Sequence, residues 1–166
     1  MDYFIEERNW SQGLSWFEEQ FNTTDPIIRL FGEASTNHSK YPTLAGVSQK
    51  IASSLPDVKI IYLERDPIER IRSMYVHNIH KGNEKRSFDE VIINLDDNHY
   101  IAVSLYFSQF EQYLKYFPSR QINIVVSEEL RNERIETLNQ IFEFLGVKPV
   151  QSPQFWKIIH RSAKKT

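Results

Sequence analysis

Residues 58–75 have the sequence VKIIYLERDPIERIRSMY, which decides the fold of this chain. The run from Val58 to Leu63 is short, apolar and rich in β-branched residues, as is typical of a buried parallel strand. Asp66 can cap a helix, Pro67 suits its first turn, and Glu69 stands where a capping box needs an acid. The stretch therefore predicts a strand, a short turn and a helix that continues to about residue 80.

The rest of the chain alternates between helical and strand-like patterns. Apolar spacing predicts helices at residues 11–21, 44–55, 87–95, 106–117 and 135–145, and strands at 27–31 and 121–126. Such alternation indicates βαβ units and a parallel sheet with helices on both faces, a three-layer α/β fold. No repeat or linker divides the chain, so residues 1–166 are predicted to form a single domain.

Composition limits the classes of function. The 166 residues are 40% hydrophobic and carry a formal net charge of -2, which gives no argument for binding nucleic acid or a membrane. The absence of cysteine excludes a disulfide framework, a thiolate zinc site and a cysteine nucleophile. It fits a reducing compartment, and we expect a cytoplasmic protein. An anion site must therefore be a local cluster of basic residues.

Arg65 is the first candidate for such a site. It lies just past the predicted strand, at the carboxyl end where open α/β sheets bind ligands, and a helix begins directly after it. Its guanidinium could bind a phosphate together with the helix N-terminus, the hydroxyl of Ser73, and Arg70 or Arg72. The alternative interpretation is a helix cap with a surface ion pair.

The segment at residues 60–75 resembles the 3′-phosphate-binding segment of sulfotransferases that use PAPS (3′-phosphoadenosine 5′-phosphosulfate). Arg65 and Ser73 match the two residues that hold the 3′-phosphate in that family. Residues 10–17, 32–36, 124–130 and 144–147 resemble further segments of its bacterial and heparan-sulfate-type branch, in the same order. The resemblance runs from about Tyr3 to the C-terminus and implies a fold similar to that of P-loop kinases.

The resemblance also implies a reaction and further site residues. A sulfuryl group would pass from PAPS to a hydroxyl or amine acceptor of unknown identity, a carbohydrate being one candidate, without a metal and leaving adenosine 3′,5′-bisphosphate. Glu33, at the end of the predicted strand 27–31, is the catalytic candidate, with a hydrogen bond to a neighbouring loop as its alternative role. His38 could also act as a base, although an exposed loop histidine is the simpler interpretation. Arg161 and Lys164 lie in a basic run that resembles a loop reaching the 3′-phosphate, or else form a solvated tail.

One part of the family pattern is missing from the sequence. The family's first strand and the loop that grips the 5′-phosphosulfate should precede residues 10–17, and the five glycines form no such loop. We therefore expect Met1 to be an internal methionine of a longer enzyme, and the open sheet edge to favour a homo-oligomer. The alternatives are an inactive remnant that binds adenosine 3′,5′-bisphosphate or a protein partner, and a nucleotide kinase or NTPase. The lack of Gly-x-x-x-x-Gly-Lys argues against the kinase or NTPase.

Overall fold

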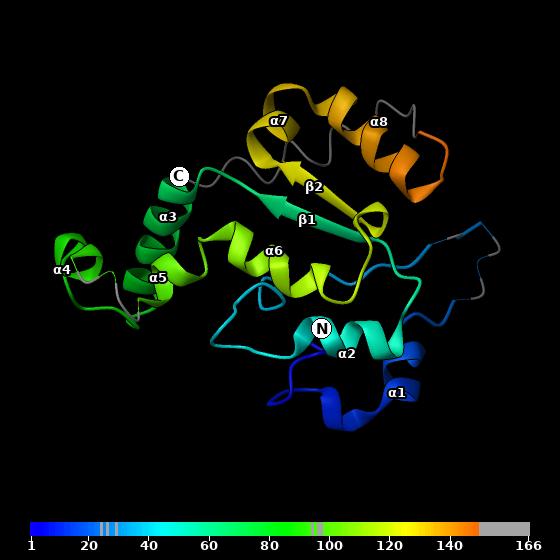
Figure 1. Ribbon diagram of the computed structural model, residues 1–166, viewed down its shortest axis with the longest axis horizontal. Helices are drawn as coiled ribbons and strands as arrows, with labels where there is room; N and C mark the ends of the chain where they lie inside the picture. Colours follow the sequence, from blue (N-terminus) through cyan, green and yellow to red (C-terminus); the bar gives the residue numbers. More distant parts are fainter. Residues whose placement is uncertain (24, 26, 29, 94, 96–97, 150–166) are drawn as a thin grey trace.

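The computed structural model describes residues 1–149 apart from 24, 26, 29, 94, 96 and 97. Runs of helices separate the two strands along these residues (Figure 1). The elements in chain order are η1 (Trp10–Gln12), α1 (Leu14–Glu19), α2 (Val47–Ser54), β1 (Ile60–Glu64), α3 (Pro67–His80), α4 (Phe88–Ile92), α5 (His99–Ala102), α6 (Tyr106–Leu114), η2 (Ser119–Gln121), β2 (Ile122–Val126), α7 (Ser127–Asn132) and α8 (Arg134–Leu145).

The two strands pair in parallel, in a register that joins Ile60 to Ile122 and Glu64 to Val126. Helices α6 and α2 lie on one side of this sheet, and α7 and α8 lie on the other (Figure 1). The predicted three-layer α/β fold with parallel strands is confirmed. Both strands end at the same edge of the sheet, so β1 delivers the residues that follow it beside the start of α7.

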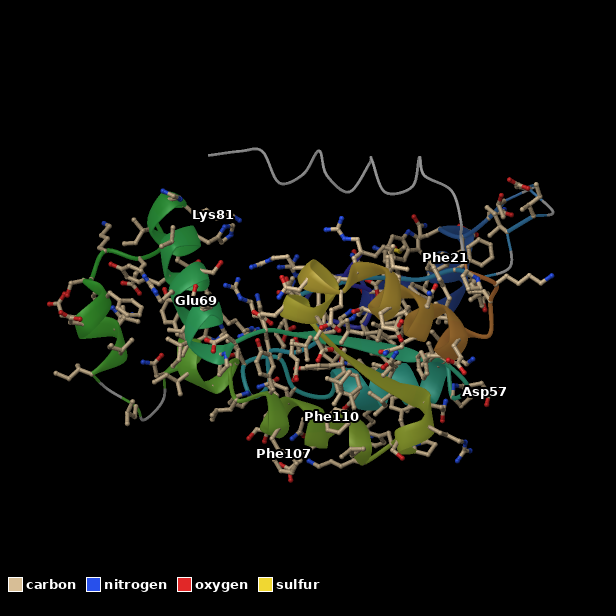
Figure 2. All side chains as sticks on the ribbon, turned by 90° about the horizontal axis from the view of Figure 1, so that it is seen from above. Phe21, Asp57, Glu69, Lys81, Phe107 and Phe110 are labelled. Atoms are coloured by element: carbon tan, nitrogen blue, oxygen red, sulfur yellow. The ribbon has the colours of Figure 1, made fainter. Side chains whose placement is uncertain are left out.

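The face of the sheet toward α6 is aromatic. Tyr62 of β1 is buried, and its ring lies 6.3 Å from the Tyr106 ring and 6.4 Å from the Phe110 ring. Figure 2 shows Phe110 and Phe107 on α6, and Phe107 is 70% exposed, so the two phenylalanines belong to different faces of the helix. This helix therefore buries one stripe against the sheet, as its apolar spacing predicts.

A second group of aromatic residues joins the N-terminal segment to this core. Tyr3 and Phe4 are almost fully buried, and the Tyr3 ring stacks on Phe17 of α1 with the ring centroids 4.6 Å apart. The fully buried members of the core are Tyr3, Phe4, Ile5, Phe17, Val47, Ile51, Tyr62, Tyr113 and Phe117. Residues 3–5 therefore fix the N-terminal segment against the same core that carries β1.

The capping residues in the sequence correctly predicted where α3 begins. The Asp66 side chain accepts a hydrogen bond from the backbone N–H of Glu69 at 2.8 Å, and Pro67 is the first helical residue. The helix ends at His80, as predicted. The second predicted capping box, between Ser87 and Glu90, is also present at the start of α4.

The predicted strand at 27–31 is wrong. Its described residues form no strand, and their large apolar side chains are 44–80% exposed. A strand needs a neighbour for its backbone hydrogen bonds, and the described sheet pairs β1 and β2 only with each other.

The face of β1 toward α7 and α8 is also incompletely covered. Because Tyr62 points toward α6, the adjacent Ile61 and Leu63 point to the opposite face, where they are 42% and 57% exposed. Val125 of β2, which pairs with Leu63, is buried. On the α6 face, Ile124 of β2 pairs with Tyr62 and is 44% exposed, so the expectation of two fully covered faces fails for both strands.

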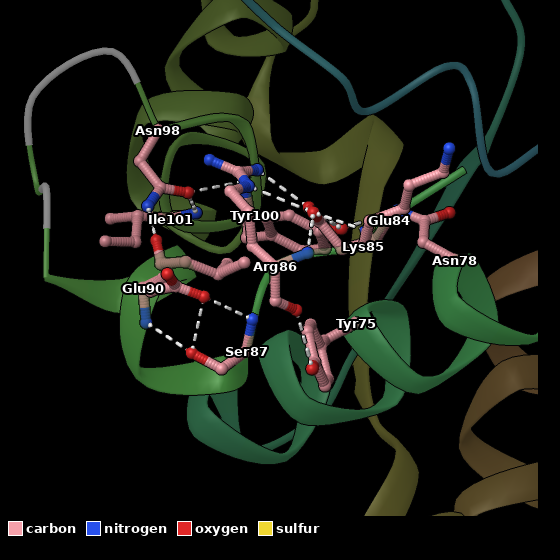
Figure 3. A network of polar contacts seen from close by, with 11 residues as sticks. Tyr75, Asn78, Glu84, Lys85, Arg86, Ser87, Glu90, Asn98, Tyr100 and Ile101 are labelled. Atoms are coloured by element: carbon pink, nitrogen blue, oxygen red, sulfur yellow. Dashed lines mark hydrogen bonds and ion pairs between the residues drawn. The ribbon is translucent and has the colours of Figure 1, made fainter. Parts of the chain in front are cut away.

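A buried carboxylate organises the segment between α3 and α5 (Figure 3). Glu84 is 9% exposed and accepts two hydrogen bonds from the Arg86 guanidinium, at 2.9 and 2.7 Å. The Tyr100 hydroxyl donates to the same carboxylate and accepts a hydrogen bond from Asn78 of α3. The network therefore ties α3 to α5 through one charged pair.

This network makes an acid-sensitive contribution to stability. Hydrogen bonds from the Arg86 side chain and backbone lower the pKa of Glu84 from its ordinary value of 4.5 to about 2. A lowered folded-state pKa means that the contribution of Glu84 to stability is complete above pH 4.5 and is lost as the pH falls toward 2.

Replacing Glu84 with glutamine removes this titrating group. Between pH 4.5 and pH 2, the free energy of unfolding, measured by urea denaturation, should therefore fall less in Glu84→Gln than in the wild type. A matched Glu111→Gln change at an exposed position of α6 should leave the slope as it is, and equal slopes for all three proteins would contradict the prediction.

Candidate functional site

Arg65 follows the last residue of β1 and precedes the cap of α3. Its backbone N–H donates a 3.3 Å hydrogen bond to the Tyr106 hydroxyl of α6, which fixes the turn. Its side chain is 35% exposed, and its Nη2 lies 3.7 Å from a carboxylate oxygen of Glu69. The guanidinium is thus held at the carboxyl end of the strand while one side stays open to solvent.

Glu69 is the acidic partner in this region, at the end of α3 next to β1 (Figure 2). Besides Arg65 it pairs with Arg72 at 3.0 Å, and its own side chain is half exposed. The surface ion pair that the sequence left open as an alternative is therefore present. Exposed ion pairs contribute about 0–1 kcal/mol, so a doubly charged phosphate can displace Glu69 from Arg65.

Ser73 lies two turns into α3 and is exposed. It is four residues after Glu69, which places the two side chains on one face of the helix. Because Glu69 contacts Arg65, this face is the one beside the guanidinium. Helical spacing therefore places Ser73 on the side of α3 that faces the Arg65 guanidinium, one turn beyond Glu69.

The two other arginines of the predicted cluster have different surroundings. Arg72 is 63% exposed and pairs with Glu69. Arg70 turns toward α5 and α6, where it donates to the Ser104 hydroxyl at 3.2 Å and lies over the Tyr106 ring. Arg72 therefore stays near the Arg65 face, whereas the contacts of Arg70 are with other elements.

The carboxyl ends of the two strands are tied together. The Ser127 hydroxyl, at the start of α7, donates to the Glu64 carbonyl at 2.8 Å. Glu128 accepts a 3.3 Å hydrogen bond from the backbone N–H of Asp66, the cap of α3. The starts of α3 and α7 therefore form one fixed edge, and Arg65 projects from it.

Glu33 lies in a buried polar cluster rather than at the end of a strand, which corrects its expected setting. Its side chain is 6% exposed and accepts a 2.7 Å hydrogen bond from the backbone N–H of Asp2. A carboxylate oxygen also lies 3.5 Å from Nε2 of His38. Among the described residues, no hydrogen bond or ion pair joins Glu33 to Arg65 or Ser73.

His38 is not the exposed loop histidine that the sequence suggested. Its side chain is 15% exposed, and its ring packs edge-on against Phe4 with 5.8 Å between ring centroids. Burial lowers the pKa of His38, while the nearby Glu33 carboxylate acts in the opposite direction. The imidazole is therefore neutral at pH 7 and can accept a proton.

Two predicted site residues fall outside the described part of the chain. Arg161 and Lys164 lie beyond residue 149, so their predicted contact with the 3′-phosphate stays a prediction. No group of three His, Cys, Asp or Glu side chains able to hold a metal occurs among the described residues. His77 and His80 lie three residues apart on α3, and they have no third ligand within that part of the chain.

The sequence missed Gln109, which holds the segment that carries His38. Gln109 is 1% exposed on α6 and makes two hydrogen bonds to the backbone of Tyr41, accepting from its N–H at 2.7 Å and donating to its carbonyl at 2.6 Å. The one available signal was a glutamine between aromatic residues on the apolar face of the helix. Such a residue is buried only when its amide has partners.

Comparison with known proteins decides the family. A model of the sulfotransferase domain matches residues 4–165, nearly the whole chain. The chain belongs to the sulfotransferase family. No helix among the described residues of this sulfotransferase is long and apolar enough to cross a membrane.

Two curated relatives have names that specify heparan sulfate as what they act on. This sulfotransferase is 26% identical to a bifunctional heparan sulfate N-deacetylase/N-sulfotransferase of Drosophila melanogaster, over 89% of this chain and 16% of that protein. It is 25% identical to human heparan sulfate glucosamine 3-O-sulfotransferase 3B1, over 87% of this chain and 38% of that protein. The chain thus spans well under half the length of either relative.

A solved structure supports the fold. The sulfotransferase of Alicyclobacillus acidocaldarius superimposes with a TM-score of 0.68 at 24% identity, covering 89% of this chain and 65% of that one. The parallel strands and flanking helices of this chain therefore follow the fold of that solved structure.

Proposed function

We propose that this sulfotransferase takes its sulfuryl group from PAPS and that Arg65 and Ser73 hold the 3′-phosphate of the donor. The supporting observation is the place of Arg65, an open guanidinium at the end of a parallel strand and at the start of a capped helix. A phosphate there would gain a charge-assisted hydrogen bond and the positive end of the 14-residue helix α3. The hydroxyl of Ser73, on the same face, would donate a further hydrogen bond.

The proposed reaction is a direct transfer. An acceptor oxygen or nitrogen attacks the sulfur, the bond between the sulfur and the bridging phosphate oxygen breaks, and adenosine 3′,5′-bisphosphate leaves with the bonding pair. The acceptor's proton must pass to a base. We keep Glu33 as the proposed base, and His38 beside it could share that proton because its imidazole is neutral.

The proposed acceptor is a hydroxyl or amine of a carbohydrate. Support comes from the relatives, whose names specify heparan sulfate and both kinds of acceptor atom, nitrogen and oxygen. A second candidate is a non-catalytic protein that binds adenosine 3′,5′-bisphosphate, favoured by the burial of Glu33 against Asp2. A cytoplasmic location stays a prediction from the sequence.

Transfer of radiolabelled sulfate from PAPS to heparan sulfate oligosaccharides tests the proposal. We expect label in the oligosaccharide with the wild type, and a loss of about 100-fold or more with Glu33→Gln if this carboxylate is the base. Binding of adenosine 3′,5′-bisphosphate without any transfer to these or other carbohydrates would favour the non-catalytic candidate. Absence of both binding and transfer would overturn the proposal.

Ser73→Ala is expected to weaken the binding of adenosine 3′,5′-bisphosphate by about fivefold, because one hydrogen bond contributes about 1 kcal/mol. Isothermal titration calorimetry measures this directly. Ser53→Ala, at an exposed position of α2, serves as the control for loss of a surface hydroxyl. The assignment of Ser73 fails if both variants bind as tightly as the wild type.

A further inference from the structure

The outer layer on one side of the sheet leaves part of β1 uncovered. Ile61 and Leu63 point to the side of α7 and α8, yet they are 42% and 57% exposed. Helices α7 and α8 both pack along the neighbouring strand β2 (Figure 1). The two apolar side chains of β1 on this side therefore face solvent within the described part of the chain.

Helix α8 adds further apolar surface on the same side of the sheet. Ile135 in its first turn is 64% exposed, and Leu138 and Phe142 of the same stripe are only half-buried. Of the twelve residues of α8, Thr137 is the one that is buried. A helix with such a stripe normally buries it against a neighbouring layer. The stripe of α8 and the two side chains of β1, together the open face, thus have room for one more apolar segment.

The chain leaves α8 beside the start of β1. Gly146 ends the helix in a left-handed conformation. The ammonium of Lys59, the residue before β1, donates to the Phe144 carbonyl at 2.7 Å and lies 5.6 Å from the Phe144 ring centroid. The residues from Val147 onward therefore begin at one end of the open face.

The sequence of residues 150–166, the C-terminal segment, suits an apolar partner. These residues lie outside the described part of the chain. Phe155, Ile158 and Ile159 recur at the spacing of one helical stripe, and Trp156 lies among them. A stripe of this kind is stable in water only when it packs against another apolar surface.

The C-terminal segment is long enough to cover the open face from the place where α8 ends. Leu63 comes four residues after Lys59, a distance of about 13 Å along the strand. The 17 residues of the segment would extend about 25 Å as a helix, and further in any more open conformation. The segment can therefore pass over both Ile61 and Leu63.

Charge favours the C-terminal segment over a second copy of the chain as the occupant. Helices α7 and α8 carry five glutamates and two arginines. The segment has no acidic side chain and four cationic ones, Lys157, Arg161, Lys164 and Lys165. Opposite charges favour docking of the segment, whereas two copies meeting through this face would bring two acidic surfaces together.

We infer that the C-terminal segment docks on the open face, with Phe155, Ile158 and Ile159 packed over Ile61 and Leu63. Docking would complete the outer layer of the sheet on the α8 side. The inference rests on the exposed side chains of β1, the place where α8 ends, and the charge and spacing of the segment. It does not depend on the proposed donor or acceptor.

Disulfide cross-linking tests this docking, because the chain has no cysteine of its own. The test pair combines Leu63→Cys with Ile159→Cys in the full chain. The control pair combines Phe107→Cys with Ile159→Cys, since Phe107 is exposed on α6, on the opposite side of the sheet (Figure 1). Mild oxidation and non-reducing gel electrophoresis measure the disulfide within one chain. We expect it to form at least about tenfold faster in the test pair, because docking raises the effective concentration of the two thiols.

Equal rates for the two pairs would overturn the inference. A disulfide that joins two chains in the test pair, with none inside a chain, would also overturn it and would assign the open face to a second copy.

A second measurement decides the matter if a cysteine variant does not fold. Leu63→Ala and Ile159→Ala are compared, singly and together, by urea denaturation. Docking predicts that the combined effect on the unfolding equilibrium constant differs from the product of the single effects by more than about twofold. Independent effects would overturn the docking.

Discussion

Replacing Arg65 with alanine is expected to weaken the binding of adenosine 3′,5′-bisphosphate by about ten- to a hundredfold. A hydrogen bond between charged groups contributes about 1.5–3 kcal/mol, and the guanidinium is the main charge offered to the 3′-phosphate at this edge of the sheet. Fold stability should change little, because Arg65 is partly exposed and its ion pair with Glu69 lies at the surface. Isothermal titration calorimetry gives the two dissociation constants.

Two further variants sharpen this prediction. Arg120→Ala removes the same charge from the opposite end of the sheet, just before β2, and should bind the nucleotide as the wild type does. Arg65→Lys keeps the charge but loses the planar fork of donors, so an intermediate affinity is expected. Equal affinities for Arg65→Ala and Arg120→Ala would show that long-range charge, and not a contact with Arg65, attracts the nucleotide.

Gln109→Ala is expected to lower the free energy of unfolding by about 3 kcal/mol. The side chain is 1% exposed and makes three hydrogen bonds, two to the backbone of Tyr41 and one to the carbonyl of Ala102. Removing it leaves backbone groups without partners, and each such group costs about 1–3 kcal/mol when it is cut off from water. Urea denaturation followed by circular dichroism measures the change.

Gln112→Ala provides the matched control for that prediction. It lies one turn further along α6 and makes two short-range hydrogen bonds, donating to the carbonyl of Ser108 in its own helix and accepting from the ammonium group of Lys115. Its substitution should cost well under 1 kcal/mol. If the two variants lose the same stability, the bonds between Gln109 and Tyr41 do not hold the segment that carries His38 and Lys40.

Local signals in the sequence predicted those elements that local interactions determine. The start of α3 is an example, since Asp66, Pro67 and Glu69 specify a cap through contacts within four residues. The strand β1 was also predictable, because its short run of apolar, β-branched residues is itself a local pattern, and the run pairs in parallel with β2.

The prediction failed where the answer depends on distant partners. Residues 27–31 have the composition of a strand, yet a strand forms only beside another strand, and the described sheet offers none there. The burial of His38 depends likewise on packing against Phe4, more than 30 residues earlier, which no local pattern reveals.

The candidate site also has one part that a local sequence pattern predicts and another part that depends on the fold. Arg65 and Ser73 are close in sequence and follow a recognisable segment, so a single stretch pointed to both. Arg70 was proposed from the same stretch, but its contacts with Ser104 and Tyr106 depend on the fold, which brings residues about 30 positions apart together.

The central claim is that this sulfotransferase recognises a 3′-phosphate, and one comparison of ligands on the unmodified protein tests it. Calorimetric titrations with adenosine 3′,5′-bisphosphate and with adenosine 5′-monophosphate differ only in that group. The account predicts that the bisphosphate binds at least about tenfold more tightly, as expected for a charge-assisted contact. Equal affinities, or tighter binding of the monophosphate, would contradict it.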